Sequence, residues 1–297
     1  EFLLINHPHD CPICDQVGEC EPQDVAMSYG GDVSTYTEQK RVVEDKDFGP
    51  LISGEMTRCI HCTRCVRFGE EVAGIKEMGA IGRGEHMEIG TYVKMSLHSE
   101  MSGNIIDLCP VGALTSKPFR FTARAWEISQ RNSIAPHDCI GSNLHVHSFR
   151  NEVVRVVPRE NEDINETWLS DRDRFSYEGL NSDDRVTSPM IKVDGRWEDT
   201  DWDTALHKVV DGITVITKGK GADQLGAIAS PTNTVEELYL LQKLMRSVGS
   251  DNIDHRVGQI DFSDENDAPM FPWLGQSIPD IEKNDACLLI GSNIRRD

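Results

Sequence analysis

The chain lacks any long apolar run. No stretch of its 297 residues approaches the ~18 consecutive apolar residues of a membrane-spanning helix, so no span is expected. Residues 1–6 contain no basic stretch and no cleavage site, so they are not a signal peptide. We expect them to be the end of a helix whose beginning is missing. The chain also stops just after the apolar run Ala286–Ile290, which predicts an internal piece of a longer protein, truncated at both ends.

Positive charge is also scarce. The chain carries 50 acidic and 30 basic residues, a formal net charge of −20. Such a surface repels phosphate backbones and anionic lipid headgroups, which disfavours nucleic-acid binding and direct membrane insertion or adsorption. A membrane association would therefore run through a partner protein. The segment 79–84 holds three glycines, but no helix signal follows it, so a nucleotide site is not expected.

Cysteine, by contrast, is well represented. There are nine cysteines, an odd number, and seven belong to two sets within the first 109 residues. A disulfide framework is typical of short secreted domains, whereas this chain is long and has no export signal. The two sets are therefore interpreted as metal ligands.

The first set runs His7-x3-Cys11-x2-Cys14-x5-Cys20. Two cysteines separated by two residues can face one metal core, because a tight turn brings their sulfurs to the same side. We predict that these four residues bind a [4Fe–4S] cluster in which one imidazole replaces one thiolate. His9 is the alternative histidine ligand, although its loop to Cys11 is tighter. A zinc site with three cysteines and one histidine is the other interpretation.

The second set is Cys59-x2-Cys62-x2-Cys65, completed by the distant Cys109, which a proline follows. Three closely spaced cysteines and a remote Cys-Pro are typical of bacterial-ferredoxin ligation of a [4Fe–4S] cubane. Zinc sites usually take two cysteines from each of two segments, so three plus one favours iron–sulfur ligation. Cys139 is the alternative fourth ligand.

Charged and imidazole side chains accompany the second set. Arg58, Arg64 and Arg67 either offset the negative charge of a cluster or are ordinary surface residues. The spacing of His61 allows at most a hydrogen bond to the ligands. His145 and His147 are expected to be exposed polar residues of a strand.

Periodicity predicts the remaining fold. Residues 142–157 predict a β-hairpin with its turn at Asn151-Glu152, and 159–194 predict a polar loop. Apolar residues recur at helical spacing from residue 202, directly after the capping residue Asp201, which predicts a helix. A capping box at 234–237 predicts a second helix. Apolar runs at 225–229 and 286–290 predict buried strands, the latter with Cys287 as a core thiol. Strand, helix and strand in this order indicate a doubly wound α/β domain.

Three segments, 7–23, 58–68 and 109–114, carry a close resemblance to one family. In these three segments the chain resembles the large iron–sulfur subunit (75 kDa-type, designated G in bacteria) of respiratory complex I, NADH:quinone oxidoreductase. Segments 163–168 and 173–175 resemble the same protein, and 197–210 is similar to the beginning of the molybdopterin oxidoreductases. Departures such as Val17 and Pro22 fall between the ligands.

The resemblance implies an α+β iron–sulfur (ferredoxin-like) region followed by an α/β molybdopterin-oxidoreductase-like domain. We expect an iron–sulfur domain at 1–130, a small β-rich subdomain at 131–190 and the start of the α/β domain at 191–297. The subdomain resembles the 4Fe-4S Mo/W bis-MGD-type domain, where some relatives bind a further cluster. The corresponding four positions here hold no cysteine, so two clusters are expected; they are Ala135, Asp138, Ser142 and Ser170.

The resemblance also implies the function. It predicts an oxidoreductase subunit that relays electrons from NADH and FMN towards quinone, with no bond-making chemistry in this chain. NADH, FMN and quinone would bind to partner subunits of the peripheral arm, on the flavin side and the quinone side. A [2Fe–2S] cluster is expected upstream of Glu1, and no molybdopterin is expected. The complex would lie at the inner (cytoplasmic or mitochondrial) membrane, facing the cytoplasm or the matrix.

Two alternatives stay open at this point. An electron-input or catalytic subunit of an NAD-linked formate dehydrogenase or hydrogenase shares both ligand patterns, but it would need further cysteine or selenocysteine ligands. A zinc-stabilised interaction scaffold would contain zinc in place of iron.

Overall fold

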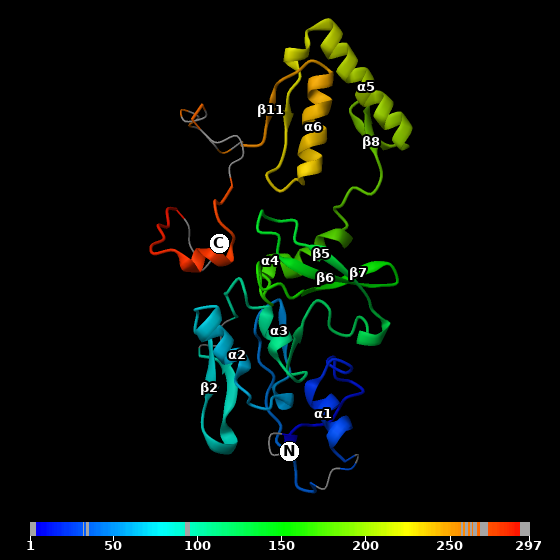
Figure 1. Ribbon diagram of the computed structural model, residues 1–297. Coiled ribbons are helices and arrows are strands. Elements are labelled where there is room, and N and C mark those ends of the chain that lie inside the picture. Colours follow the sequence, from blue (N-terminus) through cyan, green and yellow to red (C-terminus); the bar gives the residue numbers. More distant parts are fainter. Residues whose placement is uncertain are drawn as a thin grey trace. The chain divides into compact units, whose positions relative to one another are not determined.

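The computed structural model describes residues 4–31, 33, 36–92, 96–256, 258, 261, 263, 266–267 and 273–291 (Figure 1). The chain divides into two units. The first comprises 1–135, 142–178 and 278–297, and the second comprises 136–141 and 179–277. The helix end predicted at residues 1–6 lies partly outside the described residues.

The first unit consists of short elements joined by turns. Its α-helices are α1 (Glu21–Tyr29), α2 (Arg64–Arg67), α3 (Asn104–Leu108) and α4 (Asp171–Phe175). Two antiparallel pairs are formed by β1 (Ile52–Gly54) with β4 (Leu114–Ser116) and by β2 (Met78–Ile81) with β3 (Glu88–Thr91). An antiparallel sheet contains β5 (Ser129–Ile134), β6 (Asn143–Phe149) and β7 (Glu152–Pro158).

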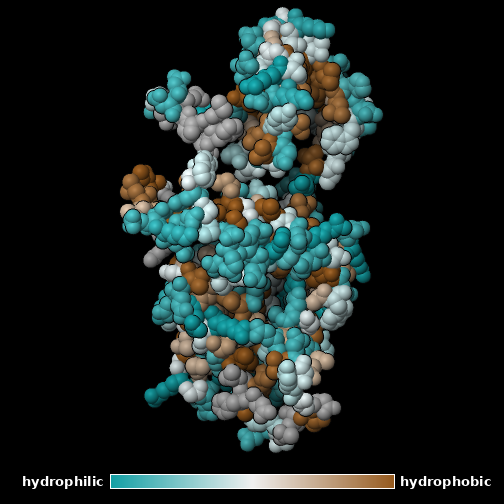
Figure 2. All heavy atoms as spheres, viewed as in Figure 1, coloured by the Kyte–Doolittle hydropathy of each residue, from teal (hydrophilic) through white to brown (hydrophobic). Residues whose placement is uncertain are grey.

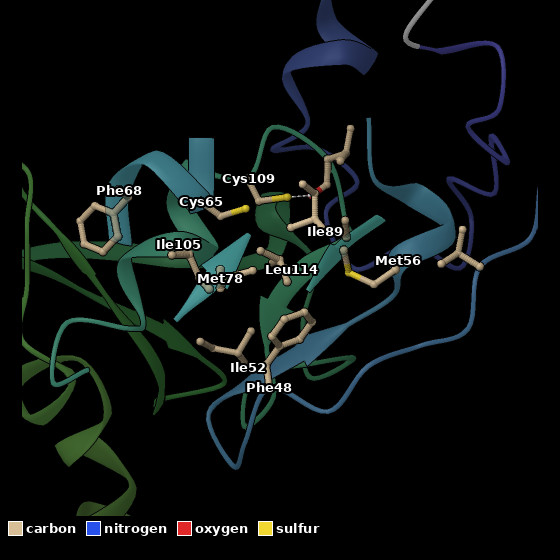
Figure 3. Close-up of a cluster of buried hydrophobic side chains, with 13 residues drawn as sticks. Phe48, Ile52, Met56, Cys65, Phe68, Met78, Ile89, Ile105, Cys109 and Leu114 are labelled. Atoms are coloured by element: carbon tan, nitrogen blue, oxygen red, sulfur yellow. Dashed lines mark hydrogen bonds between the residues drawn. The ribbon is translucent and has the colours of Figure 1, made fainter. Parts of the chain in front are cut away.

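An apolar core holds the cysteine-bearing turns of this unit in place. Phe48, Ile52 and Ile89 are almost completely buried in it. Cys65 and Cys109 belong to the same core, and Figure 3 shows their side chains near each other, where they line one cavity. Burial of the surrounding apolar side chains therefore fixes the positions of two predicted ligands.

The hairpin predicted at 142–157 is present as β6 and β7. Its turn lies one residue earlier than predicted, at Arg150 and Asn151, whose φ angles are 51° and 68°. A two-residue hairpin turn of this kind needs positive φ at both positions, and Asn tolerates that conformation. The turn therefore lies at the two residues that adopt positive φ, because this conformation fits the twist of the flanking strands.

The prediction of a loop at 159–194 is wrong in part. The segment contains α4, a 3₁₀ helix at Ser176–Asn181 and strand β8 (Met190–Val193), which pairs with β9 (Arg196–Asp199). The hydroxyl of Ser170 accepts a hydrogen bond from the Asp173 amide (3.2 Å) and caps α4. A helix of one turn is too short for hydrophobic periodicity to reveal it.

The second unit combines helices with a short parallel strand pair. Strands β10 (Ala227–Ile228) and β11 (Ile253–Asp254) run parallel and flank α6 (Val235–Ser247) in the sequence, after α5 (Trp202–Gly219). The Asp201 carboxylate accepts from the Thr204 amide (2.8 Å), and the capping box at 234–237 is complete. The predicted helices and their caps are confirmed.

The predicted buried strand at Ala286–Ile290 is wrong. These residues form no strand and are exposed, with Leu288 at 83%, and the Cys287 thiol is exposed as well. A parallel strand needs a paired neighbour and cover on both faces, and within the described part of the chain no strand pairs with this run.

No helix among the described residues is both long enough and apolar enough to cross a membrane. On the face shown in Figure 2, hydrophilic side chains predominate and apolar ones are scattered between them.

Candidate metal centres

The four cysteines of the second set line one cavity. Cys59 follows a 3₁₀ turn at Met56–Arg58, Cys65 lies in α2, and Cys109 ends α3. The remaining wall is mostly apolar and is formed by Met56, Ile60, Thr63, Arg64, Ile89, Val111, Ala113 and Leu114. The structure thus brings all four predicted ligands together in an apolar enclosure, as a buried redox centre requires.

Left-handed backbone turns direct the cysteines at this cavity. His61 and Thr63, on either side of Cys62, have φ angles of 54° and 61°. Positive φ is uncommon for any residue with a Cβ and is strained for a β-branched one, so the surrounding structure must hold Thr63 there. The His61 amide donates to the Cys59 sulfur (3.4 Å), and the His61 ring contacts Arg41 (2.9 Å). The expected hydrogen bond from His61 therefore comes from its backbone.

Burial keeps the Cys65 and Cys109 thiols protonated when no metal is bound. It raises the pKa of Cys65 to about 12 and that of Cys109 to about 11, and neighbouring cysteines add to both shifts. Cys109 donates a hydrogen bond to the Val111 carbonyl (2.9 Å). Metal binding must displace these protons, because the thiolate is the ligand.

The first set lies in turns that lead into α1. Cys14 is buried, whereas Cys11 and Cys20 are half-buried, and Cys20 is the N-cap residue of α1. Burial raises the pKa of Cys20, and the nearby Cys14 and Cys11 raise it further. The three thiols are thus close enough to influence one another electrostatically.

His7 offers a free nitrogen in this region. It is 8% exposed, and its buried Nε2 has no hydrogen-bond partner, whereas Nδ1 accepts from the His9 amide (3.2 Å). Burial, with smaller contributions from neighbouring cations, lowers the pKa of His7 to about 4. The imidazole is therefore neutral at pH 7, as a metal ligand must be. Ligation through Nε2 would place the ring proton on Nδ1, so the His9 amide would have to turn away.

We predict that His7→Ala disturbs the EPR signal of the first cluster and spares that of the second, because it removes the unpartnered buried nitrogen. His9→Ala is the matched control, since His9 is exposed and its hydrogen bond to His7 comes from its backbone amide, which alanine retains. Low-temperature EPR of both reduced variants makes the comparison. Loss of the signal in His9→Ala with retention in His7→Ala would show that the ligand assignment is wrong.

One short segment, Cys109–Ala113, touches both cysteine sets. Cys109 faces the second cavity, while the Pro110 carbonyl accepts a hydrogen bond from the Cys20 thiol (3.6 Å). A Cβ at Gly112 would lie 2.2 Å from the Cys14 sulfur, so only glycine fits there. We call residues 109–113 the linking segment. The sequence showed Cys109-Pro110 as part of one site, and the contacts with the other site emerge only from the structure.

A hydrogen-bonded clamp positions α3, which carries Cys109 at its end. The Asp171 carboxylate accepts from the amides of Ser102 (3.1 Å) and Gly103 (2.6 Å). The Asn104 side chain donates to the Leu169 carbonyl (2.7 Å) and accepts from its amide (3.0 Å). Buried groups paired in this way resist displacement, because breaking one pair leaves the other polar group unsatisfied.

A single metal ion and a cluster require different arrangements of donor atoms. Within the described residues, no three His, Cys, Asp or Glu side chains converge closely enough to hold one metal ion. Zinc requires four donors within ~2.3 Å of one point. A cubane instead takes one protein ligand at each of its four irons, so its ligands surround a larger body.

Arg64 and Arg67 agree with the surface interpretation, whereas Arg58 and His147 do not. Arg64 and Arg67 are exposed and pair with Glu21 and Glu71. Arg58 is buried, so the surface interpretation of this residue is wrong. The expectation of an exposed His147 is also wrong: it is 6% exposed and accepts a hydrogen bond from Arg155 (2.9 Å).

Four family models match consecutive parts of the chain. They are "NADH-ubiquinone oxidoreductase-G iron-sulfur binding region" at 1–34, "NADH-quinone oxidoreductase subunit 3, ferredoxin-like domain" at 49–115, "NADH-ubiquinone oxidoreductase NDSU1/NuoG-like, 4Fe-4S domain" at 128–178, and "Molybdopterin oxidoreductase" at 185–297. The predicted order of ferredoxin-like and molybdopterin-oxidoreductase-like regions is confirmed.

Relatives align with the whole chain. The G subunit of NADH-quinone oxidoreductase from Rickettsia felis is 48% identical over 296 residues, which is 100% of this chain and 43% of that protein. The chain belongs to this family of large iron–sulfur subunits. The 75 kDa subunit of NADH-ubiquinone oxidoreductase from Reclinomonas americana is 44% identical over 99% of this chain and 44% of its own length. The chain therefore spans less than half the length of these relatives.

A solved structure shows a more limited similarity. It is an NAD+-reducing [NiFe]-hydrogenase in the H2-reduced state, 26% identical, covering 41% of this chain and 53% of that chain with a TM-score of 0.37. A TM-score this low does not establish a shared fold.

Proposed function

We propose that this chain relays electrons through two [4Fe–4S] clusters, as an electron-transfer subunit of a complex I-type NADH:quinone oxidoreductase. One cluster would be held by His7, Cys11, Cys14 and Cys20, and the other by Cys59, Cys62, Cys65 and Cys109. The observation that carries the proposal is the linking segment, which contacts thiols of both sets within five residues. Two redox centres held by one short segment would lie close together, as electron transfer between them requires.

The protein's own groups would hold and insulate the clusters. A bound cluster supplies a one-electron redox centre. The apolar walls around Cys65 and Cys109 exclude water, and the His61 amide adds a hydrogen bond to the Cys59 sulfur. Such hydrogen bonds and the degree of burial are the protein's means of setting a cluster's reduction potential.

The region beyond residue 130 would be a scaffold without a cluster or molybdopterin of its own. We propose boundaries near 130 and 190 for its small β-rich subdomain. At the positions where some relatives bind a further cluster, Ala135 is packed in an apolar core and Ser170 caps α4. Cys139 is exposed. Ala135 and Ser170 thus have packing and capping roles in place of ligation.

The partners would be the flavin-side and quinone-side subunits of the peripheral arm, facing the cytoplasm or the matrix. We predict that the tagged chain, expressed in its own cells, co-purifies with flavin- and quinone-site subunits, because a relay works only between a donor and an acceptor. The tagged Cys59→Ala/Cys65→Ala variant, which lacks two ligands of the four-cysteine cluster, is the control for assembly that depends on that cluster. Recovery of the unmodified chain as a free monomer would contradict the proposal.

A further inference from the structure

The guanidinium of Arg58 lies between the two cysteine sets. Arg58 directly precedes Cys59 of the second set, and sequence proximity alone would assign its charge to that site. Its side chain is only 6% exposed, and it extends toward the first set. A buried guanidinium keeps its positive charge and must therefore be paired.

Its contacts come mainly from the first set and from the linking segment. Arg58 donates to the Asp10 carboxylate through Nε (3.0 Å) and Nη2 (2.6 Å), and Asp10 directly precedes Cys11. It also donates to the Gly112 carbonyl (3.4 Å), and its side chain lies near the Cys14 sulfur, because a Cβ at Gly112 would lie within 4 Å of both. Arg58 thus meets one ligand of the first set and the neighbour of another.

Two further charges complete the surroundings. Glu55 forms ion pairs with both Arg58 and Arg120, so Arg58 is shared between two carboxylates and Glu55 between two guanidinium groups. The hydrogen bonds from Arg58 lower the pKa of Asp10, which keeps this carboxylate ionised. The group of four charges is balanced, and removal of Arg58 alone would leave Asp10 and Glu55 with one cation fewer.

We propose that Arg58 is a positioning residue that sets the reduction potential of the histidine-ligated cluster by holding a buried positive charge against Cys14. This inference rests on the proposed function, because it requires a cluster at the first set. Reduction adds one electron to the cluster, and a nearby cation stabilises the reduced form. The effect is strong only where burial limits screening by water and salt, which holds for Arg58 and not for the exposed Arg67.

The test is a redox titration of the full chain loaded with iron and sulfide, followed by EPR. Arg58→Met removes the charge and keeps the length of the side chain. We expect it to shift the midpoint potential of the histidine-ligated cluster downward, and by more than that of the four-cysteine cluster. Asp10→Asn removes the opposing charge and should shift the same cluster upward. Arg67→Met, with a side chain 69% exposed, is the matched control and should shift neither.

The outcomes separate this inference from the proposed function. If both clusters form in Arg58→Met and the potentials are unchanged, or if the four-cysteine cluster shifts more, the inference is wrong and the relay proposal stands. If Arg58→Met fails to assemble the first cluster, the Asp10→Asn variant decides. An upward shift in the midpoint potential of its histidine-ligated cluster supports the inference, and an unchanged potential overturns it. If the unaltered chain assembles no cluster at the first set, the proposed function fails and the inference fails with it.

Discussion

Cys109→Ala should lower the iron content of the protein by about one cluster, or convert the four-cysteine cluster to a three-iron form. Cys109 is the ligand that α3 and the linking segment deliver to the second cavity. Loss of one buried sulfur costs about 1 kcal/mol of packing, which is too little to unfold the unit, so the effect should be confined to the metal. Iron analysis and EPR of the reduced variant measure it.

The control for this variant is Cys139→Ala, because Cys139 is exposed and was the alternative fourth ligand. Its iron content and spectra should match those of the unaltered chain. Unchanged iron in Cys109→Ala, together with loss of a cluster in Cys139→Ala, would reverse the assignment of the fourth ligand.

Gly112→Ala should abolish most of the signal of the histidine-ligated cluster, although Gly112 lies close in sequence to a ligand of the other one. The new Cβ would lie 2.2 Å from the Cys14 sulfur and 3.2 Å from the Gln16 Cβ. The sulfur must move away, and the neighbouring side chain leaves it little room. The four-cysteine cluster should be less affected, because its cavity lies on the other side of the linking segment.

Gly179→Ala is the matched control for this substitution. Apart from its chain neighbours, no heavy atom of the described residues lies within 4 Å of a Cβ at Gly179, so the same chemical change should leave both clusters intact. Equal signals of the first cluster in the two variants would contradict the close contact between Gly112 and Cys14.

The sequence was sufficient to predict that the cysteines of the second set lie together, and to predict the elements with strong local signals. Spacing alone indicated which cysteines belong together, and the structure places Cys59, Cys62, Cys65 and Cys109 around one cavity. Caps such as Asp201 are visible in sequence because a cap and its partner lie three residues apart.

What the sequence could not predict depends on contacts between distant segments. Arg58 precedes a ligand of one set and contacts the other, and no local pattern encodes that direction. The same holds for Gly112, whose need for a hydrogen in place of a side chain arises from Cys14, 98 positions earlier. The apolar run at 286–290 suggested a strand, but strand formation depends on a partner that local sequence does not specify.

Metal analysis with low-temperature EPR of the anaerobically purified, reduced chain tests the central claim most directly. Two cubanes predict about eight iron atoms per chain, little zinc, and two distinct [4Fe–4S] signals. One or two zinc atoms per chain without a paramagnetic signal would contradict the claim and support a zinc scaffold. A reproducible value near twelve iron atoms, with a third signal that Cys139→Ser removes, would contradict the assignment of two clusters.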